Sequence, residues 1–215
     1  MTQTSDALAE VIATRLVPVI VIDDVAAALP LADALVAGGL RSAEVTFRTE
    51  AAEAVVQAMS ADGRLLVGAG TVVTADQVDR AVAAGARFIV SPGLSTAVVR
   101  RSRDLGVPVF PGVATATEII AALDEGVNVL KFFPAEPLGG VGMVKALAAP
   151  FRSVRFIPTG GITAAQLPEY LAVPAVAAVG GSWMVAPKLI GAGRWDEITR
   201  LTAEAVAVAA ESTKE

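Results

Sequence analysis

Val127-Asn128-Val129-Leu130-Lys131-Phe132-Phe133-Pro134 is the stretch of this 215-residue chain on which the prediction of its fold depends. Its run of apolar residues is typical of a short buried strand that ends before Pro134. The helix expected before it begins at a capping box, Thr115-Ala116-Thr117-Glu118, and ends at Gly126. We therefore expect one strand–helix unit of a parallel sheet here.

The same alternation recurs along the chain. Further capping boxes begin at Thr74 and Thr163. Eight strands are predicted, at residues 17–22, 43–47, 65–70, 87–91, 107–112, 128–132, 154–159 and 175–180. Units of roughly 20 to 25 residues are near the minimum for eight parallel strand–helix repeats.

The predicted fold is therefore an α/β protein with one domain over residues 1–215, built as a (β/α)8 TIM barrel. An additional N-terminal helix is expected near residues 5–13, and a C-terminal helix near residues 195–210 closes the ring. A doubly wound open sheet is the alternative, because the pattern alone does not prove closure.

The composition excludes several classes of protein. The chain has no histidine and no cysteine, so Ser-His-Asp and Cys-His catalysis, disulfides, and zinc sites built on imidazole or thiolate are excluded. The net charge of −5 gives no general basic surface for nucleic acid. No apolar run approaches the roughly 20 residues of a membrane span, and no secretion signal is visible. We expect a cytoplasmic protein with no nucleic-acid or membrane partner.

Lys131 is the polar exception in its apolar strand. A buried ammonium is costly, and desolvation favours the neutral amine. A neutral amine attacks a carbonyl carbon and forms a Schiff base, which makes Lys131 a candidate nucleophile. The alternative is a lysine at a strand end whose ammonium extends to solvent.

The strand expected at 43–47 carries a second polar group. Side chains alternate along a strand, so Glu44, Thr46 and Arg48 share one face, while the opposite face is apolar. The apolar face can pack on helices, and we therefore expect the polar face to point into the barrel. The alternative is that Glu44 and Arg48 form an ion pair with each other and take no part in a reaction.

Pairs of glycines follow the last two expected strands. Gly160-Gly161 comes after the strand at 154–159, and Gly180-Gly181-Ser182 ends the strand at 175–180. Barrels that bind phosphorylated substrates often hold the phosphate on the backbone N–H groups of these two loops. The glycine pairs predict a phosphate site, with ordinary tight turns as the alternative.

Six segments carry a resemblance that covers nearly the whole chain. They are EVTFRTE at 44–50, GAGTV at 68–72, SPG at 91–93, KFFPAE at 131–136, PTGGI at 158–162 and GGSW at 180–183. In order and spacing they resemble the KDPG/KHG aldolases, which are the class I 2-dehydro-3-deoxy-6-phosphogluconate and 4-hydroxy-2-oxoglutarate aldolases. The segments around Lys131 and Glu44 are the specific ones.

The resemblance implies a homotrimer that cleaves 2-dehydro-3-deoxy-6-phosphogluconate to pyruvate and D-glyceraldehyde 3-phosphate, with 4-hydroxy-2-oxoglutarate as a further substrate. It implies neither a metal nor an organic cofactor. Lys131 would be the Schiff-base lysine, Glu44 the general acid and base, and Arg48 the ligand of the substrate carboxylate. The remaining site residues implied are Thr71, Pro92, Phe133 and Thr159 for the substrate, and Gly160, Gly161, Gly180, Gly181 and Ser182 for the phosphate.

Three other functions stay open from the sequence. The chain could release another aldehyde, such as glyoxylate, by the same chemistry. It could be a metal-dependent pyruvate aldolase with carboxylate ligands. It could also be an oligomeric barrel scaffold or assembly subunit that retains the aldolase site. The loop at 137–143 departs from the family pattern, which leaves the range of substrates open.

Overall fold

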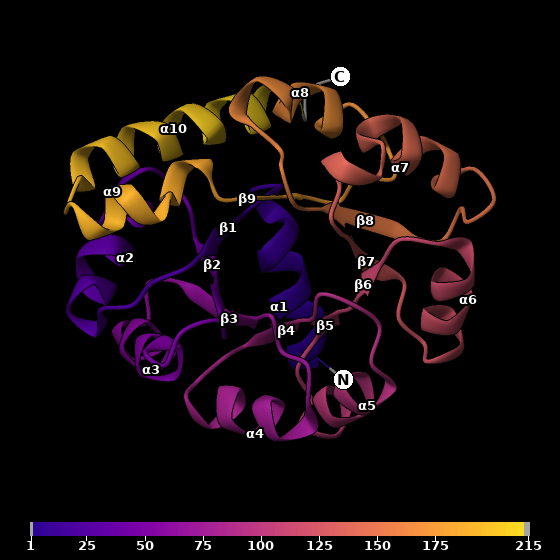
Figure 1. Ribbon diagram of the computed structural model, residues 1–215, viewed down its shortest axis with the longest axis horizontal. Coiled ribbons are helices and arrows are strands. Elements are labelled where there is room, and N and C mark those ends of the chain that lie inside the picture. Colours follow the sequence, from indigo (N-terminus) through magenta and orange to yellow (C-terminus); the bar gives the residue numbers. More distant parts are fainter. Residues whose placement is uncertain (1, 213–215) are drawn as a thin grey trace.

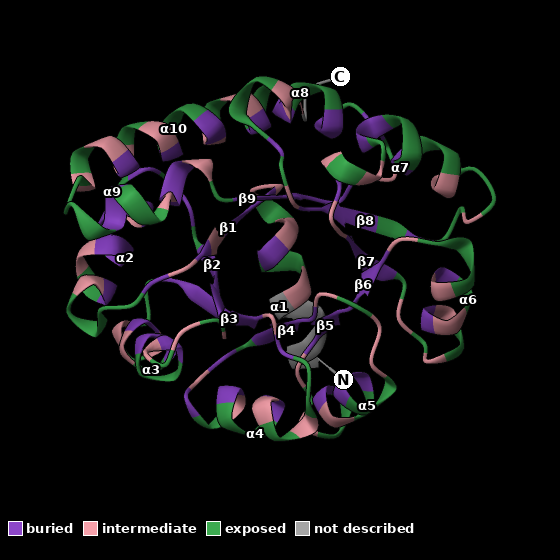
Figure 2. Cartoon of the chain, viewed as in Figure 1, coloured by how far each residue is buried: buried purple, intermediate pink, exposed green. Residues whose placement is uncertain are grey.

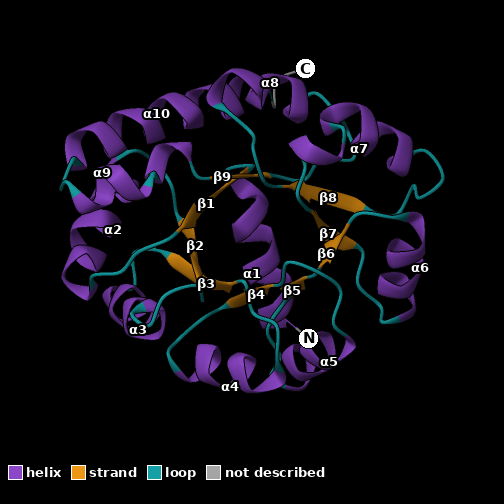
Figure 3. Ribbon diagram, in the orientation of Figure 1, coloured by secondary structure: helices purple, strands orange, loops and turns teal. Residues whose placement is uncertain are grey.

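The computed structural model describes residues 2–212, so Met1 and residues 213–215 of the predicted domain lie outside the described part (Figure 1). Short parallel strands form a curled sheet at the centre, and helices surround it (Figure 3). The strands of the described part are β1 Leu16–Ile20, β2 Ser42–Thr46, β3 Leu66–Gly70, β4 Phe88–Val90, β5 Val109–Phe110, β6 Gly112–Val113, β7 Val129–Phe132, β8 Arg155–Pro158 and β9 Val179–Gly181.

Helices connect these strands at the places where the sequence predicts them. The α-helices are α1 Thr2–Ala13, α2 Ala28–Ala37, α3 Ala52–Asp62, α4 Ala75–Ala83, α5 Thr96–Asp104, α6 Ala116–Asp124, α7 Gly140–Ala148, α8 Leu167–Leu171, α9 Pro187–Gly191 and α10 Trp195–Glu211. Four short 3-10 turns are η1 Val25–Ala27, η2 Glu136–Leu138, η3 Ala164–Gln166 and η4 Trp183–Val185. Within residues 2–212, no helix has the length and apolar character needed to cross a membrane.

The predicted capping boxes begin helical segments. Thr115 accepts a hydrogen bond from the Glu118 backbone N–H at the start of α6, and Glu118 bonds back to Thr115. The box at Thr163 begins η3. Thr74 caps α4 by accepting from the Gln77 backbone, but the Gln77 side chain accepts from the Val73 N–H, so the box predicted at Thr74 is only half formed. Because each cap satisfies backbone N–H groups that the first helical turn leaves unpaired, these threonines define where the helices start.

The strands follow one another around the sheet in chain order. One set of hydrogen-bonded strands runs β5-β4-β3-β2-β1-β9 and a second runs β6-β7-β8, with parallel pairing throughout. The last strand pairs with the first, through Leu16 and Val179. The predicted parallel α/β architecture is confirmed, and the order shows no reversal of the kind that a doubly wound sheet requires.

Two of the predicted strands differ from those observed. The strand expected at 107–112 is divided into β5 and β6 around Pro111, which has no N–H to donate to a ladder. Its carbonyl still accepts from the Lys131 N–H at 2.9 Å. The strand expected at 175–180 is replaced by β9, which begins at Val179, and the preceding residues pair only with Phe156.

Two apolar cores lie on either side of the sheet. The larger one fills the space between the strands and the surrounding helices, whose inner faces are buried (Figure 2). The smaller one lies inside the curl, where Val17, Leu66 and Phe88 near the amino ends of strands pack with Val11 of α1. α1 also packs against β1 and β3, so it covers the amino ends of the strands. The carboxyl ends are left for a site, as is typical of parallel sheets.

Candidate active site

Lys131 and Glu44 meet inside the curl of the sheet. Lys131 lies on β7 and Glu44 on β2, and the lysine Nζ donates to Glu44 Oε1 at 3.1 Å. The two side chains are only 6% and 3% exposed. The lysine therefore does not extend to solvent, and Glu44 pairs with Lys131 rather than with Arg48. A desolvated pair of this kind is stable only because each charge compensates the other.

Gly70 makes room for the Glu44 carboxylate. A Cβ atom at Gly70 would lie 2.2 Å from Glu44 Oε1, so any side chain on this part of β3 would displace the carboxylate. On the other side of β2, the Thr46 hydroxyl donates to the Ile20 carbonyl at 2.8 Å and joins β2 to β1. The position of the carboxylate is thus determined by its two neighbouring strands.

A cavity of about 330 Å³ opens at the carboxyl ends of the strands, with Lys131 in its wall. Most of the residues predicted for the site line it: Arg48, Thr71, Pro92, Lys131, Phe133, Thr159, Gly160, Gly161, Gly180 and Ser182. Glu44 lies below this wall, where it borders a void of about 10 Å³ together with Lys131. Gly181 is not on the wall, and the space that its side chain would need is occupied by the Trp183 ring.

The cavity carries two cationic groups at different depths. Lys131 Nζ lies deep in the site, 5.2 Å from the centre of the Phe133 ring, whose π-electrons attract a cation. Arg48 is exposed at the mouth. Among residues 2–212, no side chain or carbonyl pairs with its guanidinium. An anion that enters the cavity can therefore be bound by Arg48 while a carbonyl carbon of the same molecule approaches Lys131.

The Gly160–Gly161 loop forms one side of the mouth. The two glycines have φ angles of +105° and +83°, a left-handed conformation that residues with side chains rarely adopt. The Ala135 N–H donates to the Thr159 carbonyl at 2.8 Å, and the Glu136 N–H donates to the Gly160 carbonyl at 3.0 Å. A backbone without side chains, next to Gly180 and Ser182 on the same wall, is suited to bind a phosphate.

Several residues at the site escaped the sequence analysis. The apolar wall includes Val19, Val21, Ile162 and Pro187, which nothing in the sequence distinguishes from core residues. Behind the glycine loop, Glu136 accepts hydrogen bonds from Tyr170 and Gln166. Glu136 and Gln166 were visible in the segment KFFPAE and in the Thr163 capping box, but their sequence positions do not predict that they touch.

The Tyr170 hydroxyl has a strongly perturbed environment. Burial raises the pKa of Tyr170 above its ordinary value, and the hydrogen bond to the Glu136 carboxylate raises it further. The hydroxyl therefore stays protonated at neutral pH and donates to Glu136. In the described part of the chain, no group of three or more acidic side chains is arranged to hold a metal ion.

The chain is similar to the family described as KDPG and KHG aldolase over residues 8–201. It is 50% identical to the 2-dehydro-3-deoxy-phosphogluconate aldolase of Treponema pallidum over 195 residues, which cover 90% of this chain and 93% of that protein.

Solved structures give the same result. A KDPG aldolase from Legionella pneumophila, with pyruvate captured at low pH as a covalent carbinolamine intermediate, superposes with a TM-score of 0.88 at 43% identity, covering 92% of this chain and 96% of that one. The aldolase of Zymomonas mobilis with 3-phosphoglycerate also gives a TM-score of 0.88, at 42% identity, covering 95% of this chain and 96% of that one.

Proposed function

Since this chain belongs to the KDPG and KHG aldolase family, we propose that Lys131 performs the Schiff-base chemistry of that family. The protein is an aldehyde-lyase that cleaves 2-dehydro-3-deoxy-6-phosphogluconate to pyruvate and D-glyceraldehyde 3-phosphate, the cleavage step of the Entner–Doudoroff pathway. The observation that carries the proposal is the buried contact of 3.1 Å between Lys131 and Glu44, next to a cavity suited to an anion.

The reaction begins when the Lys131 amine attacks the C2 carbonyl of the keto acid. Its excess proton passes to Glu44, which already accepts a hydrogen bond from Nζ. The new C–N bond gives a carbinolamine. Protonated Glu44 returns its proton to the carbinolamine hydroxyl, which leaves as water, so that an iminium ion forms beside a free Glu44 carboxylate. The carbinolamine captured in the Legionella enzyme supports this first step.

The iminium ion then accepts the electrons of the bond that breaks. Glu44, directly or through one water, removes the proton of the C4 hydroxyl, the C3–C4 bond breaks, and the aldehyde leaves. The enamine of pyruvate remains on Lys131, and protonated Glu44 returns a proton to C3. Water adds to the iminium carbon, and its hydrolysis frees pyruvate and the amine.

The other predicted residues bind and orient the substrate. Arg48 holds the carboxylate of the keto acid by a planar two-point contact. Thr71, Pro92, Phe133 and Thr159 surround the pyruvate half. The backbone of the glycine loops and Ser182 hold the phosphate. The Zymomonas enzyme, solved with 3-phosphoglycerate, supports a phosphorylated ligand for the family.

We also propose that the curled sheet is a closed (β/α)8 barrel and that the chain is one domain. The segment from β5 to β6 links the two sets of strands on one side. On the other side, parallel bridges join Phe156 to Val176 and Thr159 to Gly180. Family membership supports a homotrimer in the cytoplasm, and light scattering on the purified protein would measure the assembly.

4-Hydroxy-2-oxoglutarate is a second substrate that the name of the family supports. It has the same pyruvyl half, so Lys131, Glu44 and Arg48 would have the same roles as with the phosphorylated substrate. Its distal end is smaller and carries no phosphate, so it would leave the phosphate loop unused. A scaffold without activity is not favoured, because the amine, the carboxylate and the cavity are all intact.

The decisive experiment is reductive trapping. The protein is incubated with pyruvate and borohydride, and its intact mass is measured beside that of Lys131→Ala. We expect a pyruvyl adduct on the unmodified protein and none on the variant, whose substrate turnover should also be abolished. Absence of an adduct on the unmodified protein would overturn the Schiff-base mechanism, and turnover that a chelator abolishes would point to a metal-dependent aldolase.

A further inference from the structure

A small polar network lies behind the Gly160–Gly161 loop, on the side away from the cavity. The Glu136 carboxylate is its centre. One oxygen accepts from the Tyr170 hydroxyl, and the other accepts from Gln166 Nε2 at 2.6 Å. Tyr170 is fully buried, and none of the three side chains lines the cavity. The chemistry proposed above leaves this network without a role.

The network contacts the chain on both sides of the glycine loop, at Gly160 and at Thr163. At the first end, the Glu136 N–H donates to the Gly160 carbonyl. At the second end, Gln166 Oε1 accepts from the N–H and the hydroxyl of Thr163, at 2.9 Å and 2.8 Å. The same Gln166 amide therefore joins Thr163 to the Glu136 carboxylate, so Glu136 reaches Gly160 through its backbone N–H and Thr163 through its side chain.

The packing around Glu136 leaves it little freedom. A Cβ atom at Gly161 would lie 2.8 Å from Glu136 Cβ, and one at Gly140 would lie 3.1 Å from Glu136 Oε1. The Glu136 side chain therefore fills the space between the phosphate loop and the start of α7. Glu136 is half-buried and lies close to both glycines, so we expect a shift of its side chain to displace the loop.

Glu136 also belongs to the segment that carries the nucleophile. Residues 131–136 run from Lys131 through the end of β7 into η2. The loop packs closely against the same segment. A Cβ atom at Gly160 would lie only 3.2 Å from the Phe133 ring and from Pro134. The spacing between the Lys131 amine and the N–H groups of the loop is thus determined by one continuous, tightly packed unit.

We infer that Glu136 is a positioning residue that holds the phosphate loop at a set distance from Lys131 and so selects keto acids that carry a phosphate at the matching chain length. This inference rests on the proposed function. A carboxylate suits the role because it accepts on both oxygens, one from Tyr170 and one from Gln166. A glutamine side chain at position 136 has one acceptor oxygen. Its NH2 group would face one of the two donors, and two donors cannot form a hydrogen bond with each other.

The test compares two substrates in the Glu136→Gln variant. We measure kcat and KM for 2-dehydro-3-deoxy-6-phosphogluconate and for unphosphorylated 4-hydroxy-2-oxoglutarate. Loss of one buried acceptor should raise KM for the phosphorylated substrate by about 10-fold. The kcat/KM for the unphosphorylated substrate and the rate of borohydride trapping with pyruvate should change by less than about two-fold, because neither uses the loop.

Two further variants make the test specific. Tyr170→Phe removes only the hydroxyl and should shift the preference in the same direction by a smaller factor. Glu169→Gln changes an exposed carboxylate on the same helix as Tyr170 and should leave both substrates unaffected. If Glu136→Gln does not fold, Tyr170→Phe decides the question.

The outcomes separate this inference from the proposed function. An unmodified protein that neither forms the pyruvyl adduct nor cleaves the phosphorylated substrate would overturn the proposed function. If the unmodified protein is active, an equal loss on both substrates would mean that Glu136 serves stability alone. An unchanged ratio of kcat/KM values in both variants would also contradict the positioning role.

Discussion

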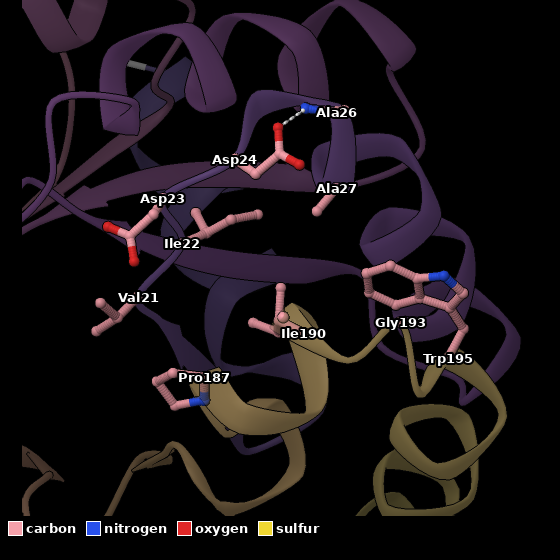
Figure 4. A pocket seen from close by; sticks show the side chains of 11 residues that line it. Val21, Ile22, Asp23, Asp24, Ala26, Ala27, Pro187, Ile190, Gly193 and Trp195 are labelled. Atoms are coloured by element: carbon pink, nitrogen blue, oxygen red, sulfur yellow. Dashed lines mark hydrogen bonds between the residues drawn. The ribbon is translucent and has the colours of Figure 1, made fainter.

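Two neighbouring cavities share a wall at Val21 and Pro187, yet they are chemically different. The cavity beside Lys131 measures about 330 Å³. The second measures about 370 Å³ and lies between the β1–α2 connection and the α9 region (Figure 4). Its charged residues, Asp23 and Asp24, are both exposed, and Asp24 accepts from the Ala26 N–H at 2.9 Å.

The two cavities are similar in volume, and we expect the second to be the less reactive one. Exposed carboxylates are solvated and screened, so they keep their ordinary chemistry. Lys131 and Glu44 are withdrawn from water, and each depends on the other for compensation of its charge. The comparison teaches that a reactive site is recognised by buried groups that face each other, and that the volume of the cavity does not identify it.

Replacing one carboxylate by its amide should lower kcat far more in the cavity beside Lys131 than in the second cavity. Glu44→Gln keeps the shape of the side chain but removes the base, so we expect kcat to fall by roughly 10² to 10⁴-fold. Steady-state cleavage of the phosphorylated keto acid measures this. Some pyruvate trapping on Lys131 should persist, at a reduced rate because Glu44 also accepts the proton of the first step. A variant with normal turnover would show that another group moves the proton.

Arg48→Lys tests the cationic group at the mouth. Lysine keeps the charge and loses the planar two-point contact, so we expect KM for the keto acid to rise by roughly 10- to 100-fold with a smaller change in kcat. Arg194→Lys is the matched control beside the second cavity, where, within residues 2–212, the Arg194 guanidinium forms an ion pair with Glu197 alone. Equal effects of the two substitutions would remove Arg48 from the binding site.

Asp23→Asn should give the smallest effect. Asp23 is exposed in the wall of the second cavity, and we expect kcat and KM to stay within about two-fold of the unmodified values, as for most surface substitutions. The same assay with both substrates provides the measurement. A loss as large as that of Glu44→Gln would show that the two cavities work as one site.

The sequence predicts much of this site because its signals are local. Each signal lies within a few neighbouring positions. The signals are a lysine in an apolar strand, the alternating polar residues Glu44, Thr46 and Arg48, and the threonine caps. They correctly predict the strand that carries Lys131 and the inward face of Glu44. The family resemblance adds the remaining wall residues.

Other features depend on contacts between distant segments. Nothing near Glu44 predicts that its partner is Lys131 rather than Arg48, because β2 and β7 approach each other only after the sheet curls. The division of one strand at Pro111 depends on which neighbour each half pairs with. The network of Glu136 likewise forms only when α8 packs behind the loop.

The position of α1 has a consequence for the order in which products leave. Within the described residues, the helix covers the amino ends of the strands, and the void of about 10 Å³ beneath Lys131 holds at most one water, so we expect substrate and products to pass through the carboxyl-end mouth. In the proposed mechanism, pyruvate is formed on the deep amine, and the aldehyde half would lie between it and the mouth. We therefore expect the aldehyde to depart first and its departure to open the path for the water that releases pyruvate.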